Sequence, residues 1–396
     1  MKHFAAVLLF VTACHETPEP LPPLRPAEDA PALDALRAAS FDQAVQLSTA
    51  QLAVAPKDAE AAAIHGLASW INAANQAYVD FEVRKSWFLI DGFLDPKHAS
   101  AIGALDAKLE AVDHDMAVVA ADPRFAMELC LACWQFDWNH DGTINERDLQ
   151  LLTIDQDDHG KPLPEGDPRR KPTFRFDVGD ALWVRAMISF QRAGLQLVMA
   201  YNWADAETGH DGGATIIHLK DPARVAKAKE LVLAGLDFSD ASRKAYLDET
   251  DDDREWVPSP KQKSHPIPLD VDDGLYKTWS DVVTDVRDLM AGKTGIPLKE
   301  IAGSLDAKMY RMTPDIYIDV AAMFDHPQDI LIRKERGDGE SEVKQFDDLL
   351  HGILGKGYAE HKTPSPLVKR LLGYAQEMER GGDSIEHKLR YLMWIN

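Results

Sequence analysis

The feature that most constrains this fold is a helical spacing of apolar residues, every three or four positions, along most of the chain. From Pro31 to about Ala121 this spacing runs through an alanine-rich sequence. It returns over residues 177–203, 222–248, 275–290, 366–379 and 385–394. Short runs at 173–177, 316–318 and 330–332 instead indicate β-strands. We therefore predict a mainly α fold: an irregular helical array with a few short strands.

Part of the first helical region follows a known repeat pattern. The residues in register with it are Phe41, Ala44, Leu52, Pro56 and Gly66. This run resembles one tetratricopeptide repeat and the start of a second, after which Tyr78 stands where that family has a small residue. Solenoids need about three repeats for stability. The resemblance therefore implies a helical hairpin inside a larger α-domain, with a peptide-binding groove as the functional alternative.

Residues 137–148 have the composition of a twelve-residue calcium loop. Oxygen ligands fall at loop positions 1, 3, 5, 7, 9 and 12, which are Asp137, Asn139, Asp141, Thr143 (through its carbonyl), Asn145 and Asp148. Gly142 occupies position 6, where the backbone must turn sharply. The sequence therefore predicts that these six residues bind Ca²⁺.

This loop resembles those of EF-hands and, because it closes with Asp148 instead of glutamate, more closely those of dockerin modules. The resemblance covers residues 136–152. Dockerins carry two such loops, and the second candidate here, which begins at Asp155, has Gly166 in place of a closing carboxylate. We therefore predict an acidic turn there and one structural Ca²⁺ site of modest affinity, typical of extracytoplasmic modules. A dockerin-like assembly module is an alternative.

The N-terminus has the pattern of a targeting peptide. A short basic start is followed by the apolar run Phe4–Val11 and then by Val11–Cys14. This resembles a bacterial lipobox, which implies cleavage after residue 13 and lipidation of Cys14, hence a membrane anchor. Residues 14–31 are rich in proline and predict an extended tether. Because His15 follows the cysteine, the resemblance favours the outer membrane of the cell envelope, with the folded part facing the periplasm or the exterior.

The net charge and the cysteines limit which ligands and which cysteine chemistry the chain can have. The formal charge of −22 disfavours nucleic-acid binding and favours cation binding. Cys130 and Cys133 lie within a segment, 124–136, that we predict to be helical. Trp134 follows them where c-type haem attachment needs histidine. Core packing, a local disulfide, and redox or metal chemistry stay open for this pair.

The chain divides at changes in composition. We predict the following regions: a signal peptide at 1–13, a tether at 14–31, a helical region at 32–121, a calcium-loop region with its connector at 122–172, a central helical region at 173–257 and an α-rich C-terminal region at 258–396. Asp177 is the expected N-cap of the long central helix. The acidic tract 249–255 and the proline-rich run 258–268 predict an exposed loop or a domain boundary.

No motif names a catalytic residue. The chain has no His-Glu-x-x-His, no Gly-x-Ser-x-Gly, no P-loop and no dinucleotide fingerprint, and its 14 histidines lack ligand spacing along one helix. We therefore favour a binding or scaffolding role, with a protein partner on the helical surface. The alternative is an extracytoplasmic enzyme of unrecognised class, which would need a pocket lined by buried, converging His, Asp or Glu side chains.

Overall fold

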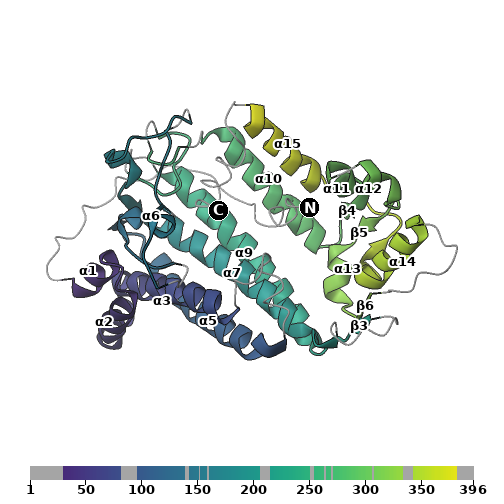
Figure 1. Cartoon of the computed structure of the whole chain (residues 1–396), viewed down its shortest axis with the longest axis horizontal. Helices are drawn as coiled ribbons and strands as arrows, with labels where there is room; N and C mark the ends of the chain where they lie inside the picture. The colour runs from purple at the N-terminus through teal and green to yellow at the C-terminus, as the bar shows by residue number, and fades with distance from the viewer. Residues whose placement is uncertain are drawn as a thin grey trace.

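A computed structural model of the chain describes residues 30–81, 96–138, 142–150, 152–157, 160–205, 215–249, 254–262, 265–268, 271–305, 307–332 and 342–380. Most of these residues are helical and the strands are short, so the mainly α prediction is confirmed (Figure 1). Within the described part of the chain, no helix is both long enough and apolar enough to cross a bilayer.

Four long helices pack side by side in sequence order (Figure 1). They are α3 (Ala59–Asp80), α5 (Ala99–Ala120), α7 (Val178–Ala200) and α9 (Pro222–Asp248). The shorter helices α1 (Pro31–Arg37) and α2 (Phe41–Val54) pack at the edge of this array against α3. The α2–α3 pair is the helical hairpin expected from the repeat pattern. Gly66 allows α3 to approach α5 closely, since a Cβ there would lie 2.4 Å from Met116 Cε.

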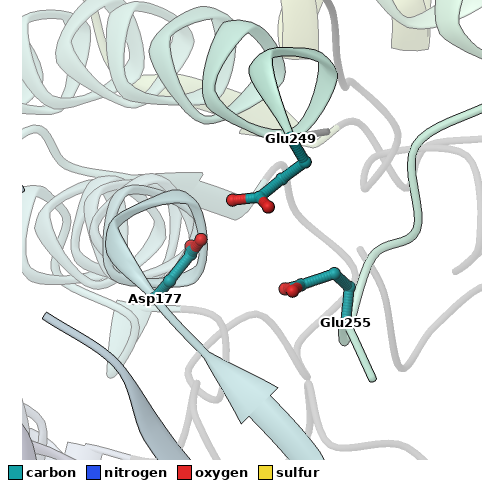
Figure 2. Close-up of side chains that lie close together, drawn as sticks. All are labelled: Asp177, Glu249 and Glu255. Carbon is teal, nitrogen blue, oxygen red and sulfur yellow. The ribbon is translucent and has the colours of Figure 1, made fainter. Parts of the chain in front are cut away.

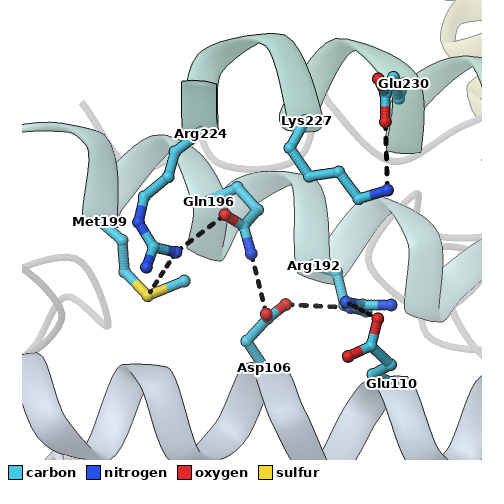
Figure 3. Close-up of polar contacts among 8 residues, drawn as sticks. All are labelled: Asp106, Glu110, Arg192, Gln196, Met199, Arg224, Lys227 and Glu230. Carbon is cyan, nitrogen blue, oxygen red and sulfur yellow. Dashed lines mark hydrogen bonds and ion pairs between the residues drawn. The ribbon is translucent and has the colours of Figure 1, made fainter. Parts of the chain in front are cut away.

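A partly buried polar network joins three of these helices (Figure 3). Arg192 on α7 donates to Asp106 Oδ1 at 3.0 Å and to Glu110 Oε1 at 2.8 Å, both on α5. Gln196, one turn further along α7, donates to Asp106 Oδ2 at 2.8 Å. Gln196 also accepts from Arg224 on α9 at 3.0 Å. Because each of these charges has a partner on a neighbouring helix, the network fixes the register of α5, α7 and α9.

The segment before the calcium loop is not the helix that we predicted over 124–136. It contains the strand β1 (Met127–Leu129), which pairs antiparallel with β2 (Phe174–Phe176), and then the 3₁₀ turn η3 (Leu131–Cys133). Cys130 and Cys133 form a disulfide across this turn. Pairing with β2, remote in sequence, overrides the helical spacing of the apolar residues. The predicted strand at 173–177 is confirmed as β2.

The C-terminal region combines helices with short strands. Its helices are α10 (Asp273–Met290), α11 (Leu298–Leu305), α12 (Ala307–Met312), α13 (Val320–Asp325), α14 (Glu342–Leu354) and α15 (Leu367–Arg380). The strands β4 (Ile296–Pro297), β5 (Tyr317–Ile318) and β7 (Tyr358–Ala359) form one sheet, whereas β6 (Ile330–Ile332) pairs with β3 (Thr215–Ile217). The two strands predicted here exist but belong to different sheets. The helix predicted over 385–394 lies outside the described residues.

The described residues of the expected exposed loop after α9, 254–262 and 265–268, are mostly buried. Trp256, Val257 and Ile267 are buried in one apolar cluster with Tyr246 of α9 and Tyr276 of α10. The Tyr276 hydroxyl donates to the carbonyl of Pro258 at 2.7 Å. Exposure was wrongly predicted for these described residues because the acidic and proline-rich composition concealed the large apolar residues between the two runs; residues 250–253 lie outside the described residues. This segment brings Glu255 beneath the end of α9.

Candidate metal-binding sites

The predicted calcium loop, residues 137–148, has the expected turn at position 6. Gly142 has a φ of 85°, in the left-handed region that glycine tolerates and other residues disfavour. Its N–H donates to Asp137 Oδ2 at 2.8 Å. A carboxylate has about four acceptor sites on its two oxygens, so Asp137 can hold this amide and still ligate a cation.

The closing residue of the loop is buried and held by backbone amides. Asp148 is 4% exposed and lies in α6 (Glu146–Gln150), which begins directly after loop position 9. Asp148 Oδ1 accepts from the Trp138 N–H at 3.1 Å, and Oδ2 accepts from the Asn145 N–H at 3.0 Å. The structure therefore ties the end of the loop to its second residue.

Of the other predicted calcium ligands, the structure describes two and leaves two outside the described residues. Thr143 is exposed and Asn145 is partly buried. Asn139 and Asp141 lie outside the described residues, as does Cys14. In the second candidate, Asp157 Oδ1 accepts from the Lys161 N–H at 2.9 Å, and Gly160 has a φ of 71°. That segment forms the acidic turn that we expected.

A second group of carboxylates, which we call the acidic centre, consists of Asp177, Glu249 and Glu255. Their side chains point toward one another from three separate segments (Figure 2). One oxygen from each lies within 4.8 Å of the other two. The three residues are 7%, 9% and 0% exposed. Among the described residues, this is the one group of three or more potential ligands close enough to hold a metal ion.

Local structure places each member of the acidic centre. Asp177 is the N-cap of α7, as predicted: its Oδ1 accepts from the Gly179 N–H at 2.6 Å. Asp180 completes a capping box by accepting from the Asp177 N–H at 2.8 Å. Glu249 directly follows α9. Glu255 is held beside β2 through an isolated parallel bridge to Arg175.

A buried arginine and further titratable groups lie beside the acidic centre. Arg175, itself buried, lies 3.5 Å from Glu255 through its Nη1. Burial raises the pKa of Asp180 well above its usual value, and the neighbouring Asp177 raises it further. Tyr246, whose pKa burial also raises, donates its hydroxyl to Asp180 Oδ1 at 2.9 Å. The Arg175 guanidinium therefore lies beside a group of buried carboxyl groups, and the raised pKa of Asp180 favours its protonated form.

The ends of the two long helices have opposite effects on the negative charges of the acidic centre. The amides at the start of α7 favour a negative charge at Asp177, whereas the carbonyls at the end of α9 disfavour one at Glu249. Buried charges persist where they are paired or bind a metal. Three carboxylates at this spacing are the hard oxygen ligands preferred by Ca²⁺, Mg²⁺ and Mn²⁺.

The acidic centre was missed in the sequence because its members are far apart and each has an ordinary local explanation. Asp177 was assigned only as a helix cap, and the two glutamates only as part of a solvated tract. The available signal was Trp256 and Val257 directly after Glu255, which mark that end of the tract as buried.

The chain matches no protein-family model, no curated protein and no solved structure.

Proposed function

We propose that this chain is a lipid-anchored protein of the bacterial envelope that holds a structural Ca²⁺ in loop 137–148 and serves in binding or scaffolding. Lipidation of Cys14 would supply the anchor, and the helical surface would receive a protein partner. Calcium abundant outside the cytosol keeps such a site filled, so the ion acts as a permanent cross-link and not as a sensor. An enzyme with a structural calcium and a dockerin-like assembly module are the alternatives.

The observation that carries this proposal is the hydrogen bonding of the two terminal carboxylates of the loop. Asp137 accepts the Gly142 amide, and Asp148 accepts the amides of Trp138 and Asn145. These bonds support the placement of loop positions 1 and 12 for a shared ion, while leaving acceptor capacity on both carboxylates.

The disulfide supports the proposed location. Disulfides persist in oxidising compartments such as the periplasm and are rare in the cytosol of most bacteria. The Cys130–Cys133 bond therefore agrees with an extracytoplasmic address, which the lipobox resemblance proposes independently.

The acidic centre favours a second cation-binding function. Its carboxylates are shielded from solvent and converge on one another, with the Arg175 guanidinium 3.5 Å from Glu255. A substrate would need access that side chains at most 9% exposed do not offer. This geometry supports a held divalent cation, and an enzyme with a structural calcium stays the alternative.

One calorimetric titration of the full chain with Ca²⁺ separates the two sites. We expect two sites in the wild type and one in each of two variants: Asp137→Ala with Asp141→Ala, and Glu249→Gln. A control substitution, Asp315→Asn, changes a side chain that is 81% exposed and should leave both sites unchanged. At a calcium concentration one hundred times Kd, each filled site adds about 2.7 kcal/mol to the free energy of unfolding.

The outcomes are distinguishable. Wild-type protein that releases no heat with Ca²⁺, and melts at the same temperature in calcium and in EDTA, would contradict the calcium proposal. Binding that survives the double substitution in the loop but disappears in Glu249→Gln would assign the ion to the acidic centre alone.

A further inference from the structure

The disulfide lies directly before the proposed calcium loop. Cys133 precedes the first ligand, Asp137, by four positions and is exposed, whereas Cys130 is partly buried. Between them the chain forms a 3₁₀ turn held by backbone bonds of 3.1 Å and 3.2 Å. Such short turns have poor hydrogen-bond geometry, so the covalent bond adds a constraint to this segment beyond its two backbone bonds.

Four aromatic side chains continue from the disulfide into the loop. This aromatic cluster consists of Phe41, Trp134, Phe136 and Trp138. Phe41, the first residue of α2, lies 5.2 Å from the Trp134 ring centroid and 4.9 Å from that of Phe136. Trp138 lies 6.4 Å from Trp134 and 5.1 Å from Phe136. Trp134 directly follows the disulfide turn, so the orientation of the turn sets that of the cluster.

The cluster reaches both ends of the calcium loop. Asp137 lies in sequence between Phe136 and Trp138, and the Trp138 amide donates to the closing carboxylate of Asp148. No helix leads into the loop, since β1 and η3 occupy that place. The disulfide turn and the aromatic cluster therefore position the first ligand, a task that a preceding helix performs in an EF-hand.

We propose that the Cys130–Cys133 disulfide is a redox site through which a dithiol controls the calcium affinity of loop 137–148. This rests on the proposed calcium site. A thiolate of the dithiol attacks the sulfur of Cys133, the more exposed residue of the pair, forms a mixed disulfide and releases Cys130 as a thiolate, which takes up a proton. The second thiol of the reagent then displaces Cys133, so that the protein gains two electrons and two protons while the reagent becomes a disulfide.

Thermodynamic linkage makes the coupling reciprocal. If reduction weakens calcium binding by some factor, saturating calcium makes reduction of the disulfide less favourable by the same factor. Energetic couplings between sites are usually worth about 5-fold to 150-fold. We expect a factor of about ten, because the disulfide acts through neighbouring side chains and not as a ligand.

The test measures calcium affinity by calorimetry in the oxidised full chain, in the chain reduced with dithiothreitol, and in Cys130→Ser with Cys133→Ser. We expect the reduced protein and the serine variant to bind Ca²⁺ about tenfold more weakly than the oxidised protein. Dithiothreitol should not change the affinity of the serine variant. If that variant does not fold, the reduced wild type, with its thiols counted, gives the same comparison.

A second readout is the thiol–disulfide equilibrium in a dithiol buffer with and without Ca²⁺. Calcium should shift it toward the disulfide in the wild type but not in the loop variant Asp137→Ala with Asp141→Ala. Equal calcium affinity in both redox states would overturn the redox proposal and leave the calcium site intact. Absence of calcium binding even in the oxidised protein would overturn both.

Discussion

The calcium loop and the acidic centre use similar side chains in opposite ways. The loop takes its carboxylates from twelve consecutive residues and keeps most of its described residues at least partly exposed. The acidic centre collects three carboxylates from positions up to 78 residues apart, the span from Asp177 to Glu255, and buries them all. One is a contiguous motif and the other a product of helix packing.

This difference determines how each site affects the stability of the folded protein. If the loop lost an ion, Asp137 would stay partly exposed to water, and Asp148, although buried, would keep its two backbone amide donors. The three carboxylates of the acidic centre are all buried. Their negative charge must be stabilised by Arg175, by protonation or by a bound cation. Changes at the acidic centre should therefore act mainly on stability, and changes in the loop mainly on calcium affinity.

The largest expected effect tests the counter-charge of the acidic centre. Arg175→Met keeps much of the side-chain volume but leaves Glu255 beside other buried carboxylates without its guanidinium. Removing one partner of a buried ion pair usually costs about 3–5 kcal/mol. Urea unfolding followed by circular dichroism should show a loss of this size in the free energy of unfolding.

The matched control for Arg175 is Arg124, which pairs with Asp122 on the surface and is 70% exposed. Arg124→Met should change stability by less than about 1 kcal/mol. A similar small loss in both variants would show that the acidic centre is not held by Arg175, and the contrast between the buried and exposed sites would fail.

A smaller effect is expected from pH. Because the pKa of Asp180 is raised in the folded protein, the native state binds more protons than the unfolded state between the unfolded and folded pKa values of this group. The free energy of unfolding should therefore fall as pH rises through that window, by at most about 1.4 kcal/mol per pH unit. Asp180→Asn should remove this slope in urea titrations from pH 4 to 7.

The same titration distinguishes protonation from metal binding. A divalent cation at the acidic centre would favour the ionised carboxylates and so should reduce the wild-type slope. Identical slopes in the wild type and Asp180→Asn would mean that burial does not perturb this group, against the structure.

Those features of the fold that depend on local sequence could be predicted. Asp221 is the N-cap of α9, and its carboxylate accepts from the Ala223 N–H in the first turn; the boundaries of that helix match the predicted span. The capping box at Asp177 likewise fixed the start of α7. The segment 124–136 could not be predicted, because its structure depends on pairing with β2 some fifty residues later and on a disulfide.

The two candidate sites differ in the same way: one depends on local sequence and the other on long-range packing. The spacing of Asp137, Gly142 and Asp148 contains the whole specification of a calcium loop, so sequence alone sufficed to propose it. The acidic centre depends on where α9 ends relative to the start of α7, which follows from the packing of two long helices. Neither glutamate stands in a recognisable spacing to Asp177, so its assembly could only come from the structure.

The smallest expected effect compares two glycines. Gly142→Ala should cost about 1–2 kcal/mol because the position is left-handed, while the added methyl group would meet no atom within 4 Å. Gly103→Ala, on helix α5 and equally open, should instead stabilise by about 0.5–1 kcal/mol because alanine is the better helix former. Opposite signs in urea unfolding, with weakened Ca²⁺ binding in Gly142→Ala alone, would tie the loop conformation to its ion. If Gly142→Ala were also stabilising, the turn at loop position 6 would not be the one described, and the geometry that positions Asp137 would have to be abandoned.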